Sequence, residues 1–313
     1  MFSIIIPYYK KRKYIERCID AVLAQTFQDF EIIIVDDGSQ DDLQTVVEAK
    51  YKGNIVLISQ PNQGVSVARN TGIASATHGY IAFLDADDYW SPYYLEKVAE
   101  VINQEKGIKI IGSHYSRIKS KIEIENRSLD YFLIRNYFRN ALRNLRFFTS
   151  GTVIASDFFQ KEKGFNPLLR SGEDLDVWFR AVLSGGNAYY IKNTLAYYSD
   201  EDENQATITP KKIENRFIFN AFSIYFKNGN KKYPQEFYDF LSKYMYSNLH
   251  IIFFQNETHA DVKEIKNRIP KKYFLGELYY KIPYVVGSAI IKKPIIRKIV
   301  RKYFKFIFSY IYN

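Results

Sequence analysis

The stretch FSIIIPYYKKRKYIERCIDAVLAQTFQDFEIIIVDDGS, residues 2–39, decides the fold. Its β-branched runs at 2–6 and 31–35 predict strands, and residues 14–25 between them carry apolar side chains at helical spacing. The same alternation continues with predicted helices at 41–51 and 65–76 and predicted strands at 55–59 and 80–84. Strands and helices in alternation predict an α/β fold with a mostly parallel central sheet and helices on both faces.

The later part of the chain has a looser pattern. It predicts a helix with a basic stripe at 130–146, a helix at 173–184 and a strand at 188–191. We expect a main domain at 1–208, with halves at 1–90 and 91–208, followed by a helical region at 209–313.

Charge is distributed unevenly along the chain. Residues 1–210 carry 24 Lys and Arg against 27 Asp and Glu (net −3), and residues 211–313 carry 20 against 7 (net +13), out of totals of 44 and 34. This asymmetry predicts a polyanionic partner for the last third, either nucleic acid or an anionic membrane. No uncharged apolar run approaches the roughly 18 residues that a membrane-spanning helix needs, so we expect the chain to lie on a membrane rather than cross it.

The terminal segment predicts a membrane-contacting amphipathic helix at about 294–312. Residues 281–313 contain eight Lys or Arg and no acid, and apolar side chains recur there at helical spacing. A helix packed on its own domain, or at a homodimer interface, is the alternative. The expected membrane contacts are Arg297, Lys298, Arg301, Lys302, Phe304 and Phe308.

Carboxylates follow the predicted strands at the edge where parallel sheets bind ligands. Asp85, Asp87 and Asp88 come directly after the strand at 80–84, and oxygen ligands of this kind suit Mg²⁺ or Mn²⁺. A polar turn with a helix cap is the alternative for this triplet. Asp37 follows the second strand, where it could accept a hydrogen bond from a nucleobase or merely belong to a capped turn.

Two further residue types suit a nucleotide site. Tyr9 offers a flat face after the first strand, and Arg69 offers a forked cation on the helix that follows Gly64. Taken singly, Tyr9 could be a packing residue and Arg69 a surface cation.

Five motifs in order give a more specific indication than any one of them. The motifs are SIIIPYYK (3–10), EIIIVDDGSQD (31–41), NQGVSVARNTGI (62–73), GYIAFLDADDYWSP (79–92) and GEDLDVWFR (172–180). They resemble those of the family 2 inverting glycosyltransferases of the GT-A fold.

The resemblance implies a role for each matching residue. It implies that Pro7 and Tyr9 cradle the nucleotide, Asp37 binds the base, Arg69 contacts the diphosphate, and Asp85 and Asp87 serve the metal and ribose, with Asp87 the direct ligand. It also implies that Asp174, with Glu173 beside it, is the catalytic base, and that Asp88, Trp90 and Trp178 are candidates for sugar or acceptor contacts. If the motif is set aside, Glu173 and Asp174 could simply favour a helix N-terminus.

Two positions depart from the family pattern. Lys10 stands where the family usually has Asn, and no His follows Tyr197 and Tyr198 to serve as a further metal ligand. Glu203 could take that role, or its acidic run could be a solvated loop.

The resemblance implies transfer of one hexose or N-acetylhexosamine from a UDP-sugar, with a divalent cation (Mn²⁺ or Mg²⁺), to a membrane-associated glycan. We expect a polyprenyl-diphosphate-linked acceptor and an anionic membrane surface as partners, at the cytoplasmic face of the inner membrane, with no nucleic acid. Size and the basic end are similar to those of branching transferases in Campylobacter-type N-glycan assembly. Capsule, lipopolysaccharide core and teichoic acid synthesis are alternatives.

Two other classes of protein fit less well. A sugar nucleotidyltransferase should have a Gly-rich loop after the first strand, and residues 7–10 contain no glycine. A membrane- or nucleic-acid-binding module without catalysis would leave the acidic clusters unexplained.

Overall fold

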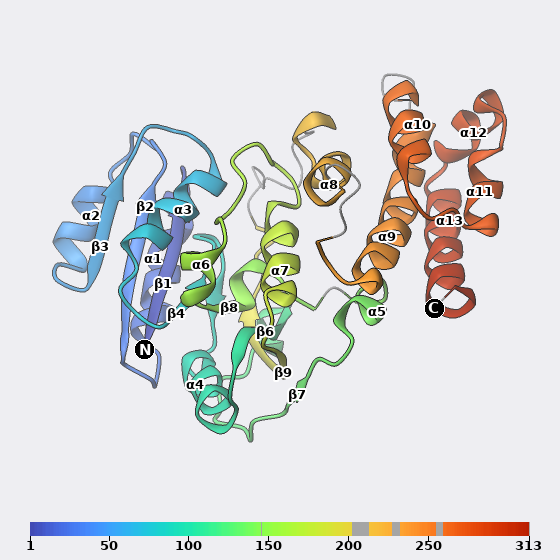
Figure 1. Cartoon of the computed structure of the whole chain (residues 1–313). Coiled ribbons are helices and arrows are strands. Elements are labelled where there is room, and N and C mark those ends of the chain that lie inside the picture. The colour runs from blue at the N-terminus through green and yellow to red at the C-terminus, as the bar shows by residue number, and fades with distance from the viewer. Residues whose placement is uncertain (145, 202–212, 227–231, 255–258, 313) are drawn as a thin grey trace. The chain divides into compact units, whose positions relative to one another are not determined.

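The computed structural model describes residues 1–312 except 145, 202–212, 227–231 and 255–258. The chain divides into two compact units (Figure 1). The first comprises residues 1–135 and 146–210, and the second comprises residues 136–145 and 211–313. Glu203 lies outside the described residues.

One sheet forms the centre of the first unit. Its strands are β1 (Phe2–Tyr8), β2 (Phe30–Asp36), β3 (Ile55–Ser59), β4 (Tyr80–Phe83), β5 (Tyr89–Trp90), β6 (Ile108–Ser116), β7 (Tyr131–Leu133), β8 (Thr152–Ala155) and β9 (Asn187–Tyr197). They run in the order β3-β2-β1-β4-β8-β6-β9-β5, and β7 pairs with β9. The first four strands pair in parallel, as the sequence predicts, and β8 joins β4 and β6 in antiparallel.

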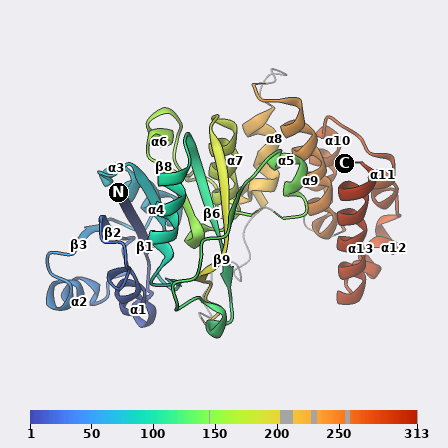
Figure 2. The same cartoon turned by 90° about the horizontal axis from the view of Figure 1, so that it is seen from below.

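Helices cover both faces of this sheet, as the two views show (Figures 1 and 2). On one face, α1 (Arg12–Leu23), α2 (Leu43–Lys50) and α4 (Tyr94–Gln104) bury their apolar sides in one core with residues of the sheet, and α4 lies against β9. The other face carries α3 (Val65–Ser75), α6 (Asp157–Lys161) and α7 (Glu173–Leu183). The predicted α/β fold is therefore confirmed.

Close packing of α3 on the sheet depends on a glycine. A Cβ atom at Gly72 would lie 2.5 Å from the Ile5 side chain of β1. Since real carbon contacts do not approach so closely, only glycine lets α3 lie this near the strand. That approach sets the position of Arg69 relative to the end of β4.

The second unit is helical. Its helices are α5 (Tyr137–Ala141), α8 (Phe217–Tyr225), α9 (Gln235–Phe253), α10 (His259–Arg268), α11 (Phe274–Tyr280), α12 (Tyr284–Ile291) and α13 (Pro294–Phe306), and a π-helical turn follows at Ile307–Ile311. Over the described part of the chain, no helix is both long and apolar enough to cross a bilayer.

The predicted helix at 130–146 is wrong. Residues 131–133 form β7 and pair with β9, and only the short helix α5 follows. The basic spacing of this segment resembles that of a helix, but Phe138 of α5 packs against Phe237 and Phe240 of α9, which draws the segment into the second unit. Long-range packing therefore overrides the local pattern.

Candidate functional site

The carboxyl ends of β1, β2 and β4 meet at one edge of the sheet. Tyr8 and Asp36 are paired at the ends of β1 and β2, and the Asp37 amide donates to the Tyr8 carbonyl at 2.8 Å. The acidic segment 85–88 follows β4, the other neighbour of β1. The parallel register predicted from sequence therefore brings these motifs to the same edge.

Asp37 organises the loop that leads into α3. Its carboxylate is buried and accepts hydrogen bonds from the Gln60 side chain and from the backbone amides of Gln63 and Gly64, at 2.7–2.9 Å. Gly64 has φ +92°, and a Cβ there would lie 1.4 Å from the Arg170 guanidinium. Asp37 thus supports the loop beside the proposed base site, and its contact with a base stays a prediction.

The first-loop residues differ in accessibility. Pro7 is buried within β1 opposite Val35. Tyr9 is 44% exposed just beyond the strand, with the Lys10 ammonium 5.3 Å from its ring centroid. Tyr9 therefore presents a face on which a base can stack, while Pro7 shapes the backbone that carries it.

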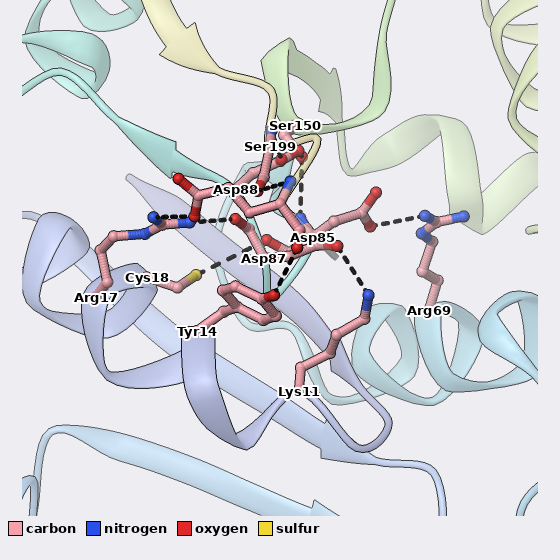
Figure 3. Close-up of polar contacts among 11 residues, drawn as sticks. Lys11, Tyr14, Arg17, Cys18, Arg69, Asp85, Asp87, Asp88, Ser150 and Ser199 are labelled. Atoms are coloured by element: carbon pink, nitrogen blue, oxygen red, sulfur yellow. Dashed lines mark hydrogen bonds and ion pairs between the residues drawn. The ribbon is translucent and has the colours of Figure 1, made fainter. Parts of the chain in front are cut away.

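Cations from two helices surround the acidic segment (Figure 3). Lys11, at the start of α1, pairs with Asp87 at 2.8 Å, and Arg69 of α3 pairs with Asp85 at 2.8 Å. Arg17 of α1 donates to the Asp87 carbonyl at 2.8 Å. Cations on opposite sides thus partly neutralise the negative charges of Asp85 and Asp87.

Burial raises the pKa of the Asp87 carboxyl, and the charge of Asp85 raises it further, against the lowering effect of Lys11. A bound cation would stabilise the ionised form of Asp87. This donor set fits a Mg²⁺ or Mn²⁺ ion that takes its remaining ligands from a diphosphate and water. Among the described residues, no group of three or more His, Cys, Asp or Glu could hold a metal by itself.

Three predicted sugar contacts are wrong, because the side chains are inside the protein. Asp88 is buried and accepts hydrogen bonds from the Ser150 hydroxyl and the Ser199 amide. Trp90 is buried, donates from Nε1 to the Ser150 carbonyl at 2.5 Å and stacks on Tyr94. These contacts hold the acidic loop and leave no free face for a sugar.

Trp178 is the third of these corrections. It is 0% exposed and packs against Phe83 and Phe165 on the α3 side of the sheet. The sequence shows an aromatic side chain near an acid pair, but helical phase turns it inward while Glu173 and Asp174 stay half-buried at the start of α7.

Arg69 connects the acids after β4 with those at the start of α7. It is buried, and its guanidinium donates to Asp85 at 2.8 Å and to Glu173 at 3.2 Å. Its Nε atom is buried without a hydrogen-bond partner among the described residues. One planar cation therefore holds two motifs that lie far apart in sequence.

Asp174 has a shifted proton affinity. Burial raises its pKa to about 6 and the neighbouring Glu173 adds to this, while Arg69 acts in the opposite direction. Oδ1 of its carboxylate accepts from the Leu175 amide at 2.8 Å, and the Thr149 hydroxyl lies 3.5 Å from Oδ2. A carboxylate with this pKa is largely ionised at neutral pH and can accept a proton.

Sequence reasoning missed the residues that support the acids. Lys11 pairs with the Asp87 carboxylate, and Arg17 donates to the Asp87 backbone carbonyl. Ser150 and Ser199 donate hydrogen bonds to Asp88. A signal for α1 was present, because Lys11, Tyr14 and Arg17 recur at helical spacing. The two serines gave none, since their positions depend on strands far from the acids in sequence.

A family model, Glycosyl transferase family 2, matches residues 3–163. The chain belongs to glycosyl transferase family 2. The prediction that it is a glycosyltransferase enzyme of this family is thereby confirmed. The matched range includes the nucleotide motifs and the acidic segment, and it ends before Glu173.

The glycosyltransferase relatives align over parts of their lengths. An uncharacterised glycosyltransferase of Nostoc is 47% identical over 102 residues, which are 32% of this chain and 32% of the relative. The Bacillus subtilis glycosyltransferase TuaG, named for teichuronic acid biosynthesis, is 31% identical over 205 residues, 63% of this chain and 78% of that protein. This chain thus spans about a third of the length of the Nostoc relative.

Solved structures confirm the fold over nearly the whole chain. TarS residues 1–349 from S. aureus, in complex with UDP-GlcNAc, match with a TM-score of 0.69 at 16% identity, covering 99% of this chain and 91% of that one. The mannosyltransferase PcManGT of Pyrobaculum calidifontis, in complex with GDP-Man and Mn²⁺, matches with a TM-score of 0.55 at 15% identity, covering 98% and 85%.

Proposed function

We propose that this protein is an inverting, non-processive glycosyltransferase that moves one hexose or N-acetylhexosamine from a UDP-sugar to a membrane-associated glycan. The observation that carries the proposal is the bridge from Arg69 to Asp85 and Glu173. It places the side chains suited to a sugar diphosphate beside an acid pair suited to activating a hydroxyl.

Asp174 acts as general base in this reaction. The acceptor oxygen attacks the anomeric carbon from the face opposite the diphosphate, and Asp174 takes the proton of that hydroxyl. The new carbon–oxygen bond forms as the bond to the diphosphate breaks, and UDP leaves. Because the pKa of Asp174 is about 6, its basic form predominates at neutral pH.

Arg69 assists departure of the diphosphate. Its buried guanidinium, paired with Asp85 at 2.8 Å, puts a positive charge at the strand edge where the diphosphate would lie, and its direct contact with phosphate oxygens stays a prediction. Asp87 and Asp85 would hold a divalent cation, which supplies further positive charge for the leaving group. The Mn²⁺ in the PcManGT structure and the shared fold support this assignment.

UDP is the nucleotide that the comparisons favour. The structure with the highest TM-score of those described above, TarS, contains UDP-GlcNAc. In this chain, exposed Tyr9 offers a stacking surface beside the loop that buried Asp37 supports. Hydrolysis measured with a panel of UDP-sugars identifies the sugar as glucose, galactose or one of their N-acetyl derivatives.

The membrane part of the proposal rests on the second unit. Phe304 and Phe308, predicted to enter the membrane, are instead buried at 1% and 0% exposure, so that prediction is wrong. They pack in an aromatic core with Tyr246 and Tyr279, because α13 and the π-helical turn after it direct these two side chains toward α9 and α11. The apolar side chains at helical spacing do form one face of a helix, but Phe304 and Phe308 on that face pack into the interior of the helical unit.

Other apolar side chains are exposed instead. Val285 of α12 is 77% exposed, Ile295 of α13 is 74% exposed, and Val286, Ile290 and Ile299 are also open to solvent. Around them lie exposed cations and no acid from 281 onward; they are Lys281, Lys292, Lys293, Arg297, Lys298, Arg301, Lys302 and Lys305. Apolar side chains within a cationic border favour an anionic lipid surface, at the cytoplasmic face of the membrane in our proposal.

One alternative acceptor has specific support. TuaG is named for teichuronic acid biosynthesis, and the alignment covers 78% of its length. A cell-wall polymer is therefore a second candidate beside a polyprenyl-diphosphate-linked oligosaccharide. Both would bring the enzyme to the membrane.

The catalytic proposal is tested by UDP release from a panel of UDP-sugars, with Mn²⁺ or Mg²⁺ and after EDTA. We expect one donor to be hydrolysed only with metal, and Asp174→Asn to abolish turnover while UDP still raises the melting temperature. Asp130→Asn, at an exposed carboxylate of the same unit, is the matched control. Full turnover by Asp174→Asn would reject the base assignment, and hydrolysis of no donor would reject the function.

The membrane proposal is tested by co-sedimentation with vesicles. We expect binding to phosphatidylglycerol–phosphatidylcholine vesicles, little binding to phosphatidylcholine alone, and loss of binding in Val285→Glu. Ile124→Glu, at a similarly exposed position of the first unit, is the control. Unchanged sedimentation of Val285→Glu would reject this surface, as would self-association that Val285→Glu abolishes without any vesicle binding.

A further inference from the structure

A cluster of aromatic rings lies beside the acids, and no role assigned so far involves it. Tyr115, near the end of β6, lies 4.2 Å from Phe148 and 5.8 Å from Tyr198 between ring centroids. Phe148 and Tyr198 are 5.5 Å apart, so the three rings contact one another. All of them belong to the first unit.

The chain connects this cluster directly to the catalytic acids. Phe148 precedes Thr149, whose hydroxyl lies 3.5 Å from Asp174. Tyr198 precedes Ser199, whose amide donates to Asp88 at 2.8 Å. Burial raises the pKa of Tyr198 and the Arg117 charge lowers it, while the charges of Asp88, Asp85 and Asp87 raise it, as expected for a ring near the acidic segment.

The cluster lies on one side of the acids, and the proposed nucleotide site lies on the other. In the sheet, β6 and β9 are separated from β1 by β4 and β8. Tyr9 follows β1 and Asp37 follows β2, so the base-binding residues belong to the far strands of that order. Tyr115 and Tyr198, at the ends of β6 and β9, therefore lie on the side of the acids away from the nucleotide residues, which is the side that we assign to the acceptor.

These rings are accessible, unlike the two tryptophans. Tyr115 is 37% exposed, and Phe148 and Tyr198 are partly exposed, whereas Trp90 and Trp178 are 2% and 0% exposed. The Arg117 guanidinium lies 4.5 Å from the Tyr198 ring centroid and is itself exposed. A partly apolar surface with a cationic donor at its edge suits a molecule that has an apolar face and a rim of hydroxyls.

We propose that Tyr115, Phe148 and Tyr198 form a stacking platform for a pyranose ring of the acceptor glycan. The inference rests on the proposed sugar transfer and deepens it by locating the acceptor. The C–H face of a hexose or N-acetylhexosamine packs on the Tyr115 ring, and Arg117 donates to its hydroxyls. This places an acceptor hydroxyl on the side of the site where Asp174 can take its proton.

The test separates acceptor binding from donor binding. Saturation-transfer NMR is recorded with methyl glycosides of glucose, galactose, N-acetylglucosamine and N-acetylgalactosamine, in the presence of UDP and Mn²⁺. We expect at least one glycoside to bind the wild-type protein through its ring protons. Tyr115→Leu should weaken it by about tenfold or more, which corresponds to about 1.4 kcal/mol.

The matched control is Phe132→Leu, an aromatic of β7 paired with Tyr190 nearer the other end of β9. It should leave glycoside binding unchanged. Tyr198→Leu serves as a second platform variant, and UDP-induced stabilisation shows that each variant is folded.

A kinetic readout separates this inference from the proposed function. Tyr115→Leu should raise the KM for the glycoside that binds, whereas the control Phe132→Leu should keep both that KM and the wild-type rate of UDP-sugar hydrolysis by water. The proposed function stands if UDP stabilises the protein and a donor is hydrolysed. In that case the platform is rejected if no glycoside binds, or if both platform variants bind the glycoside like the wild type. If no donor is hydrolysed and no nucleotide binds, the proposed function itself fails.

Discussion

Replacement of Arg69 tests whether one buried cation holds the site together. Arg69→Lys keeps the charge but loses the fork, so it can pair with Asp85 or with Glu173 but not with both as Arg69 does. Arg69→Met removes the charge and leaves both acids without this partner. The two variants therefore separate loss of geometry from loss of charge.

The contacts give the expected magnitudes. A hydrogen bond to a charged group contributes about 1.5–3 kcal/mol to stability, so Arg69→Lys should lower the free energy of unfolding by about that amount. Removing one partner of a buried ion pair costs about 3–5 kcal/mol. The Arg69 side chain is 4% exposed and Asp85 is 30% exposed, so solvent screening places Arg69→Met toward the lower end.

The same replacement should change the proton affinity of Asp174. Its pKa in the folded protein, about 6, exceeds its ordinary value of 3.8. Between these two pH values Asp174 is protonated in the folded protein and ionised in the unfolded chain. Stability from this group is therefore full at low pH and falls as pH rises through about 6. The positive charge of Arg69 lowers the pKa of Asp174. In Arg69→Met this pKa should therefore be higher, and the free energy of unfolding should continue to fall to a higher pH.

Urea unfolding measured across this pH range provides the assay. The pH dependence of Arg69→Met is compared with that of Arg69→Met combined with Asp174→Asn, which removes the titrating group. We expect the extra decline above pH 6 only when Asp174 is present. Wild-type stability in Arg69→Met, or a pH dependence that Asp174→Asn does not alter, would refute the reasoning.

Three further predictions concern neighbouring contacts. Lys11→Ala should tighten binding of Mn²⁺ alone by a few-fold, up to about tenfold, because Lys11 pairs with Asp87 at 2.8 Å; weaker Mn²⁺ binding in calorimetry would contradict this. Asp88→Ala should lower the unfolding free energy by about 1–3 kcal/mol for each buried donor left unsatisfied, at Ser150 and Ser199, and an unchanged urea midpoint would count against it. In the wild type, donor hydrolysis should rise with pH to a plateau, with a midpoint near 6 from Asp174, and a rate independent of pH from 5 to 8 would exclude that base.

Most of the nucleotide half could be predicted from the sequence. Strands and helices up to residue 84 follow from short-range periodicity, and the observed bounds of β3, Ile55–Ser59, are those predicted. The meeting of Asp37 and Asp85 at one edge follows as well, because parallel pairing aligns strand ends. Local pattern and tertiary fold agree over this part of the chain.

Side-chain direction was the common cause of the errors. Trp178, Phe304 and Phe308 have the chemistry of ligand or membrane contacts, but each is buried. Periodicity shows that a helix has an apolar face and does not say whether that face meets lipid, a ligand or the protein's own core. The segment 130–146 failed for a related reason, because α9 and β9 supply its partners from far along the chain.

The sequence by itself determined the family, the α/β order and the acids that the proposed chemistry requires, because these depend on residue type and spacing along a parallel sheet. Only the tertiary structure decided that Arg69 joins Asp85 to Glu173, and that Tyr115, Phe148 and Tyr198 rather than the tryptophans are open beside them. Those contacts join residues separated by long stretches of chain. Their geometry depends on how the sheet and its helices pack.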